Sequence, residues 1–329
     1  MRFALLSLIA LVAAIVTPVL RLIDGTVNRG AWAVYALSMN FATRTGLVLH
    51  VAQELPLQPF QNVVASGIAI CDLSNLFGYG VKKITLRLGG GVFSKAMISS
   101  IQLKANGKVI FDSTGPAVDA RMQYRGHAAN VAFLTLDFTE RFARTKMALL
   151  AGVLDTTLGI KNLRLEVTIA GATTPTLTGS AEVCLPQDTP EFVNLRPLIA
   201  RVHRNTFGVT GAGTFLLPIP HLDPNQGGSV FKRIALLSAN CTGIRIERNG
   251  IQEMTVGSAA ENNARQVEYG RATQAGLFVA DFMLDGLQED RLLDTRQALG
   301  CNLAAVYGTF SGAETVTVES EVLEPMNVY

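Results

Sequence analysis

The sequence predicts an all-β protein that contains two similar β-sandwiches in tandem, preceded by an apolar helix. Three observations support this fold class. Many short segments alternate apolar and polar residues, and turn-forming Gly, Asn, Asp and Pro separate these segments. In addition, the same series of short sequence motifs occurs twice along the chain. Alternation with a period of two places one face of each strand in a core. At 329 residues, the chain is long enough for two domains and an extension.

The composition indicates that part of the folded surface is covered. Charged residues make up 16% of the chain, against roughly 25% in an average soluble domain. Hydrophobic residues make up 49%, and the mean hydropathy is +0.30. We therefore expect copies of the chain, a membrane or both to cover some of the surface. The net charge of +2, without long basic clusters, argues against direct nucleic-acid binding.

The first residues form an apolar run. No charged residue lies between Phe3 and Leu20, and Arg2 and Arg21 flank the run. Its length is near the lower limit for a helix that spans about 30 Å of hydrocarbon. A helix that touches or enters a membrane is the favoured interpretation, and a secretory signal peptide or a buried core helix are the alternatives. The residues that we predict to face the membrane are Leu5, Leu8, Ile9, Val12, Ile15 and Val16.

Two parts of the chain carry the same signals in the same order. Residues 81–84 (VKKI) correspond to residues 231–234 (FKRI), and residues 101–107 (IQLKANG) correspond to residues 244–250 (IRIERNG). The further matched pairs are Tyr124-Arg125-Gly126 with Tyr269-Gly270-Arg271, Asp137-Phe138 with Asp281-Phe282, Leu158-Gly159 with Leu299-Gly300, Asn162-Leu163 with Asn302-Leu303, and Glu182-Val183 with Glu321-Val322. For the matches of Asn106, Asp137, Gly159 and Glu182, the offsets are 143 (249 − 106), 144 (281 − 137), 141 (300 − 159) and 139 (321 − 182). Such constant spacing indicates an internal duplication.

Local patterns place the elements within each copy. The two Asn-Gly pairs predict tight hairpin turns, because both residues tolerate positive φ angles. Apolar residues at three- and four-residue steps predict a helix over residues 140–154. Residues 185–190 are typical of a linker. The expected division is an amino-terminal helix and arm over 1–60, a first sandwich over 61–188 and a second over 189–329.

The sequence contains no motif typical of an enzyme. Gly308-Thr309-Phe310-Ser311-Gly312 lacks the spacing of a nucleophile elbow, and Gly107-Lys108 lacks the following Ser or Thr of a phosphate-binding loop. An acidic group, Glu289, Asp290 and Asp294, could bind a cation between subunits, but a solvated loop is the simpler interpretation. We predict no catalytic, cofactor-binding or metal-binding residue and no cofactor.

Cysteines and histidines show no ligand spacing. We expect buried thiols in a protein that is assembled in a reducing cytoplasm. The cysteines are Cys71, Cys184, Cys241 and Cys301. We expect the histidines to have scattered surface or capping roles. The histidines are His50, His127, His203 and His221.

Four stretches carry a resemblance to a known family. In the second copy these are residues 268–282 (EYGRATQAGLFVADF) and 290–296 (DRLLDTR), and in the first copy residues 98–110 (ISSIQLKANGKVI) and 112–115 (DSTG). The chain resembles the corticovirus-type major coat proteins of tailless, membrane-containing bacteriophages, over about residues 60 to 325. The apolar amino terminus departs from what is expected of such a coat protein.

The resemblance implies a fold and a function. It implies two tandem jelly rolls (a double jelly roll) in a major capsid protein, a structural subunit of the virion without enzymatic activity. It further implies a homotrimer that forms a pseudo-hexagonal capsomer in an icosahedral shell over an internal lipid membrane. The implied partners are neighbouring capsomers, penton and minor capsid proteins, and the viral membrane through the amino-terminal helix.

An alternative function is a secreted tandem β-sandwich that binds carbohydrate or another surface as a monomer. Such a module needs clusters of exposed aromatic residues. Aromatic residues make up only 7% of this chain, and its single tryptophan, Trp32, lies outside both copies.

Overall fold

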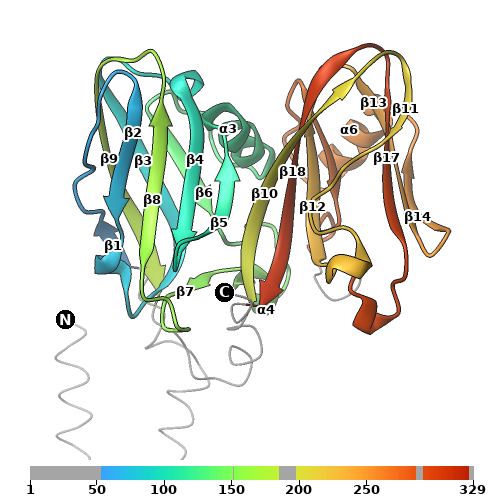
Figure 1. The fold of residues 1–329 in the computed structure, drawn as a ribbon, viewed down its shortest axis with the longest axis horizontal. Helices are drawn as coiled ribbons and strands as arrows, with labels where there is room; N and C mark the ends of the chain where they lie inside the picture. The colour runs from blue at the N-terminus through green and yellow to red at the C-terminus, as the bar shows by residue number, and fades with distance from the viewer. Residues whose placement is uncertain (1–52, 151, 185–197, 287–291, 326–329) are drawn as a thin grey trace, which may run out of the picture. The chain divides into compact units, whose positions relative to one another are not determined.

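The computed structural model describes residues 53–150, 152–184, 198–286 and 292–325. All the described residues belong to one compact unit and build two β-sandwiches (Figure 1). The predicted membrane-facing residues lie outside the described residues. Among the helices that the structure describes, none is long and apolar enough to cross a bilayer.

The first sandwich contains the strands up to the predicted linker. Its elements are β1 (Gln53–Pro56), β2 (Gly67–Asp72), β3 (Gly80–Val92), β4 (Ile98–Ala105), β5 (Lys108–Ser113), α3 (Gly115–Tyr124), β6 (Phe133–Asp137), α4 (Lys146–Leu150), β7 (Leu154–Asp155), β8 (Leu163–Ile169) and β9 (Thr173–Cys184). Short 3-10 helices lie at η1 (Ser74–Leu76) and η2 (Lys95–Met97).

The second sandwich repeats this series. Its elements are β10 (Leu198–Val209), β11 (Gly213–Leu216), β12 (Val230–Leu237), β13 (Cys241–Arg248), β14 (Ile251–Val256), α6 (Ala259–Glu268), β15 (Leu277–Asp281), β16 (Leu293–Asp294), β17 (Ala304–Phe310) and β18 (Glu314–Pro325). Short 3-10 helices lie at η3 (Pro224–Gln226) and η4 (Gln297–Leu299).

The two sandwiches have the same strand order. In the first, β1-β9-β3-β6 and β2-β8-β4-β5 are the two sheet paths, and β7 pairs with β3. In the second, β10-β18-β12-β15 and β11-β17-β13-β14 take the corresponding places, and β16 pairs with β12. The helices α3 and α6 follow the corresponding strands β5 and β14. This correspondence confirms the duplication at the level of topology.

Each sandwich has its own apolar core. The alternating pattern of β8 buries Leu163, Leu165, Val167 and Ile169, as expected for a strand with one face in the core. The first core extends from Ala69 into the start of β10, and the second core begins at Val209. The linker between them lies outside the described residues, so the proposed boundary at 188/189 stays a prediction.

The two Asn-Gly pairs form the predicted hairpin turns. The φ angles are 50° and 82° at Asn106 and Gly107, and 54° and 77° at Asn249 and Gly250. Both central residues of a type I′ turn need positive φ. Each asparagine amide also donates to a distant carbonyl, Asn106 to Gly159 at 3.0 Å and Asn249 to Gly300 at 2.8 Å. These bonds explain why a Leu-Gly segment recurs with each Asn-Gly turn.

The predicted helix over residues 140–154 is wrong in extent. The structure has a helix only over Lys146–Leu150, and Leu154 belongs to strand β7. Glu140 at the start of this segment is buried among cations rather than placed on a helix. These ion pairs hold the start of the segment in place.

The two sandwiches are in contact along α3 and β5. Strand β5 pairs in parallel with β10 at Phe111 and Val202, so one sheet of each sandwich continues into the other. Helix α3 lies on the side of the first sandwich that faces the second (Figure 1). Its last residue, Tyr124, packs in an apolar cluster with Ala235 of β12 and Val279 of β15.

Candidate functional site

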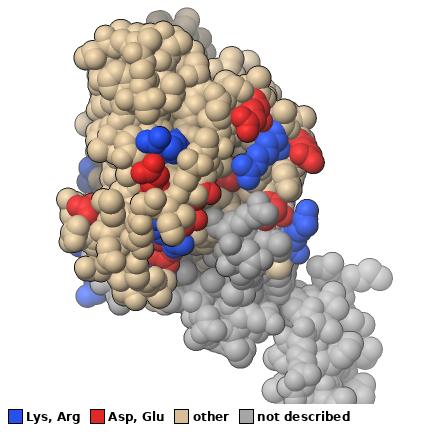
Figure 2. Space-filling view, turned by 90° about the vertical axis from the view of Figure 1, so that its right-hand side faces the viewer, with Lys and Arg blue, Asp and Glu red and all other residues tan. Residues whose placement is uncertain are grey.

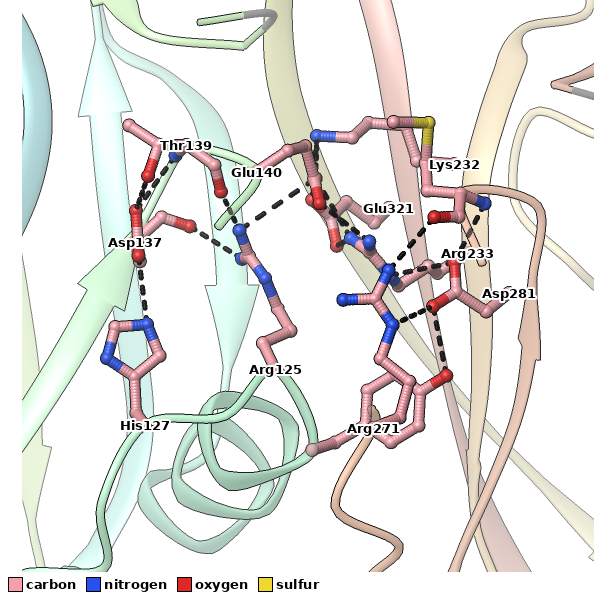
Figure 3. A network of polar contacts seen from close by, with 12 residues as sticks. Arg125, His127, Asp137, Thr139, Glu140, Lys232, Arg233, Arg271, Asp281 and Glu321 are labelled. Atoms are coloured by element: carbon pink, nitrogen blue, oxygen red, sulfur yellow. Dashed lines mark hydrogen bonds and ion pairs between the residues drawn. The ribbon is translucent and has the colours of Figure 1, made fainter. Parts of the chain in front are cut away.

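A network of buried charged side chains lies where the two sandwiches meet (Figure 3). Each of these side chains belongs to a residue that is at most 9% exposed. Burying an ion without a partner is costly, so such groups are paired in folded proteins. The cations are Arg125, Lys232, Arg233 and Arg271, and the carboxylates are Asp137, Glu140, Asp281 and Glu321. Four positive charges therefore face four negative charges.

Glu140 connects the two sandwiches. Nη1 and Nη2 of Arg233 donate to its two carboxylate oxygens at 2.9 and 2.7 Å. Lys232 also forms an ion pair with Glu140. Both cations lie 3.2 Å from carboxylate oxygens of Glu321 on the neighbouring strand β18. The planar guanidinium of Arg233 suits this two-bond contact, which a lysine in its place could not form.

Asp281 at the end of β15 binds side chains from both sandwiches. The hydroxyl of Tyr124 in α3 donates to its Oδ2 at 2.9 Å. Nε of Arg233 lies 3.1 Å from Oδ1, and Nε of Arg271 lies 3.3 Å from Oδ2. Burial and the neighbouring charge of Asp281 raise the pKa of Tyr124, so the phenol keeps its proton and stays a donor.

Asp137 has the corresponding place in the first sandwich. Its Oδ2 lies 2.9 Å from Nε2 of His127, and its Oδ1 accepts from the backbone N–H of Thr139 at 2.8 Å. Arg125 donates to the carbonyl of Asp137 at 2.7 Å and also to that of Thr139. Burial raises the pKa of Asp137, but the contacts with His127 and Arg125 outweigh it and hold the pKa at about 2.

The carboxylates at the centre stay ionised. Burial alone would raise the pKa of Glu140, but Arg233, Lys232 and Arg125 hold it well below its ordinary value. The same competition holds the pKa of Glu321 at about 2. A general acid or base works best with a pKa near the working pH. The network is therefore suited to holding two sandwiches together and not to proton transfer at neutral pH.

The duplication explains much of this network. Lys82 and Lys83 of β3 correspond to Lys232 and Arg233 of β12, and Glu182 corresponds to Glu321. Both copies have a register shift at the same point, between Val81 and Lys83 and between Phe231 and Arg233. In the first copy the three side chains stay 23–36% exposed. The contact with the first sandwich therefore buries three side chains of the second sandwich whose equivalents in the first sandwich are partly exposed.

A second buried ion pair supports the same contact. Nε of Arg121 in α3 lies 2.8 Å from Oε2 of Glu319 in β18. The hydroxyl of Ser113, at the end of β5, donates to Oε1 of Glu319 at 2.6 Å. Burial raises the pKa of Glu319 despite the charge of Arg121. Helix α3 therefore contributes two side chains, Arg121 and Tyr124, to the contact with the second sandwich.

The histidines differ from the prediction of scattered roles. His127 belongs to the network, and His203 and His221 lie together, with ring centroids 4.2 Å apart. The prediction was therefore wrong for these three histidines, because neighbouring strands and a loop bring together residues that are far apart in sequence. His50 lies outside the described residues.

The other predicted residues have ordinary structural roles. The four cysteines are free thiols, three of them buried and Cys184 half-buried. Asp294 of the acidic group forms an ion pair with Arg296 at 2.6 Å, and Glu289 and Asp290 lie outside the described residues. The signal that could have found the network was residues 231–234, where two cations interrupt a strand that is otherwise apolar.

Two equivalent sandwiches joined by a buried contact define a double jelly-roll protein. Residues 54–184 match the viral coat protein P2 N-terminal domain, and residues 199–326 match the viral coat protein P2 C-terminal domain. The chain belongs to the viral coat protein P2 family. This finding confirms the predicted family and fold class, and it makes the chain a structural component of the virion capsid.

Solved structures share the fold. The major capsid protein P2 from bacteriophage PM2 is 15% identical, with a TM-score of 0.68 over 84% of this chain and 98% of that chain. The STIV MCP is 13% identical, with a TM-score of 0.60 over 82% of this chain and 95% of that chain. PBCV-1 VP54, in the structure fitted into a reconstruction of the virophage Sputnik, is 11% identical, with a TM-score of 0.54 over 83% and 93%. A comparison with curated protein sequences gave no significant match.

Proposed function

We propose that the chain is the major shell-forming subunit of its virion and acts as a homotrimer. Three chains with two sandwiches each give a capsomer with six similar units, which is pseudo-hexagonal. Such capsomers tile an icosahedral shell over an internal membrane. The observation that carries the proposal is the duplicated strand order together with the buried ionic contact. This contact makes the pair of sandwiches one building block, and closed symmetry then lets equal blocks assemble.

The composition of the surface supports assembly. The face in Figure 2 carries few charged side chains, and most of those that it does carry lie near a group of opposite sign. On strand β13, Arg245 and Glu247 form an ion pair at 3.0 Å. Large apolar side chains are also exposed on the second sandwich, namely Leu216, Ile251, Val267, Leu299 and Leu303. Contact with further copies would remove such side chains from water.

The same proposal covers the partners and the place of assembly. Neighbouring capsomers, penton proteins and minor capsid proteins would contact the rims of the trimer. Free thiols agree with assembly in the reducing host cytoplasm. The chain would act by assembly and without catalysis, since cations keep the carboxylates at the centre of its buried network ionised.

The mass in solution tests the trimer. We expect multi-angle light scattering of the full chain in mild detergent to give about three chain masses of 35.2 kDa. We further expect Ile251→Asp to weaken this species, because Ile251 is 68% exposed and lies beside the turn where Asn249 N–H donates to the carbonyl of Leu303. Gln252→Asp, with the same new charge on the next, outward residue, is the matched control.

A monomer at all concentrations would overturn the trimer. Equal masses for the Ile251→Asp and Gln252→Asp variants would show that the Ile251 surface lies outside the contact between copies. In a monomer, neither exposed substitution is expected to change stability by more than about 0.5 kcal/mol.

We also propose that Leu5, Leu8, Ile9, Val12, Ile15 and Val16 face the viral membrane. The full chain is then expected to float with vesicles of phosphatidylcholine and phosphatidylglycerol in a density gradient. Val12→Asp is expected to abolish flotation, because a carboxylate at the centre of an apolar helix costs about 2.5–3.5 kcal/mol on insertion. Thr26→Asp, beyond the apolar run, is the control. Flotation that persists in Val12→Asp would contradict the proposal.

A further inference from the structure

Two histidines and a glutamate converge on one point of the second sandwich. Nε2 of His203 lies 3.9 Å and Nδ1 of His221 lies 3.8 Å from Oε1 of Glu324. All three ligand atoms lie within 4.8 Å of one another. The imidazole rings are tilted by 33° with their centroids 4.2 Å apart. Two imidazoles and one carboxylate are a ligand set that zinc sites use.

Three separate segments bring these side chains together. His203 lies on β10 and Glu324 on the antiparallel neighbour β18. His221 follows Pro218 and Pro220 in the loop after β11, and Asn205 of β10 donates to the carbonyl of Pro218 at 2.9 Å. His221 has a φ of 60°, a conformation that non-glycine residues adopt infrequently. The loop thus directs an imidazole at the β10–β18 pair.

The surroundings of the cluster are those of a ligand set. Nε2 of His203 is buried and has no hydrogen-bond partner among the residues that the structure describes. The hydroxyl of Ser229 donates to Oε1 of Glu324 at 2.6 Å, and Arg201 bonds to Oε2 of the same carboxylate. Carboxylates that bind metals are themselves held by such outer hydrogen bonds. The Ser229 and Arg201 contacts therefore orient Glu324 toward the two rings.

We propose that His203, His221 and Glu324 bind one divalent transition-metal ion of the zinc type. Ligand atoms about 2.0–2.2 Å from a tetrahedral ion lie about 3.3–3.6 Å apart. The histidine–glutamate spacings of 3.8 and 3.9 Å thus need to shrink by a few tenths of an ångström, and the ligand atoms of the two imidazoles, which lie within 4.8 Å, need to approach through side-chain rotation. His221 is 41% exposed, so solvent reaches the fourth position. The ion would fix the loop after β11 to the strands β10 and β18.

The test uses the full chain without a polyhistidine tag. Titration with zinc is expected to show one saturable site per chain, and cobalt is expected to give the visible absorption bands of a tetrahedral ion. His221→Asn is expected to weaken zinc binding by more than roughly 100-fold, since it removes a ligand. Asparagine accepts a positive φ, so this variant keeps the backbone. Ser229→Ala, which loses only the outer bond to Glu324, is expected to weaken binding about 10-fold.

His50→Gln is the control for zinc bound by a histidine outside the cluster, and its affinity should equal that of the parent chain. Zinc should also raise the thermal midpoint of the parent chain and leave that of His221→Asn unchanged. Absence of a saturable zinc site, or equal affinities in the parent and His221→Asn, would overturn the proposal. The measurements do not depend on trimer formation, so failure of either proposal can be recognised without the other.

Discussion

Replacement of Arg233 by alanine is expected to lower the free energy of unfolding by about 3–5 kcal/mol. The guanidinium of Arg233 binds three buried carboxylates, those of Glu140, Asp281 and Glu321. Its removal leaves these charges in a dry interior with fewer cations, and the cost of burying an unpaired charge then falls on the folded state. Urea denaturation followed by circular dichroism measures the change.

The duplication supplies a matched control in Lys83→Ala. Lys83 has the position of Arg233 in the first sandwich and pairs with Glu182 at 2.7 Å, but it is 36% exposed. Exposed ion pairs contribute about 0–1 kcal/mol, so this variant should lose little stability. Similar losses in the two variants would show that burial between the sandwiches does not determine the strength of the pair.

The comparison of the two copies also shows what sequence could predict. Alternating strands and Asn-Gly turns can be predicted from short stretches of sequence, and their constant offsets reveal the duplication. The structure confirms these predictions in the equivalent hairpins β4–β5 and β13–β14. The same comparison could not find the central contact. Glu140 corresponds to Leu284 (140 + 144), so the carboxylate that joins the sandwiches has no counterpart in the second copy. A contact between the two sandwiches depends on residues that differ between them, so comparison of the two repeats does not reveal it.

Helix α3 was missed for a local reason. It begins with Gly115 and Pro116 after the N-cap Thr114, whose hydroxyl accepts from the N–H of Ala117 at 3.3 Å. Glycine and proline suggest a turn when they are read alone, yet proline is well placed in the first turn of a helix. The cluster of His203 and His221 was missed because strand β10 and the loop after β11 bring the two residues together in the fold, which no spacing in the sequence reveals.

Acidification is expected to weaken the chain through Glu321. Burial raises the pKa of its carboxyl, but Lys232 and Arg233 outweigh burial and bring the pKa to about 2, below the ordinary 4.5. A depressed pKa gives stability that is fully present above pH 4.5 and is lost as pH falls through 2. The loss expected from this carboxyl is about 3 kcal/mol. Urea denaturation at a series of pH values between 5 and 2 measures it.

Glu321→Gln removes this titration. The variant should be less stable than the parent chain at pH 7, and its stability should fall less between pH 4.5 and 2. Glu182→Gln is the matched control from the other copy. Lys82 and Lys83 lower the pKa of Glu182 against the effect of its burial, but this carboxyl is 28% exposed and solvent screens its pairs. If the pH profile of Glu321→Gln equals that of the parent chain, Glu321 is not responsible for the loss of stability in acid. A larger change in Glu182→Gln would show that the acid-sensitive ion pair lies in the first sandwich.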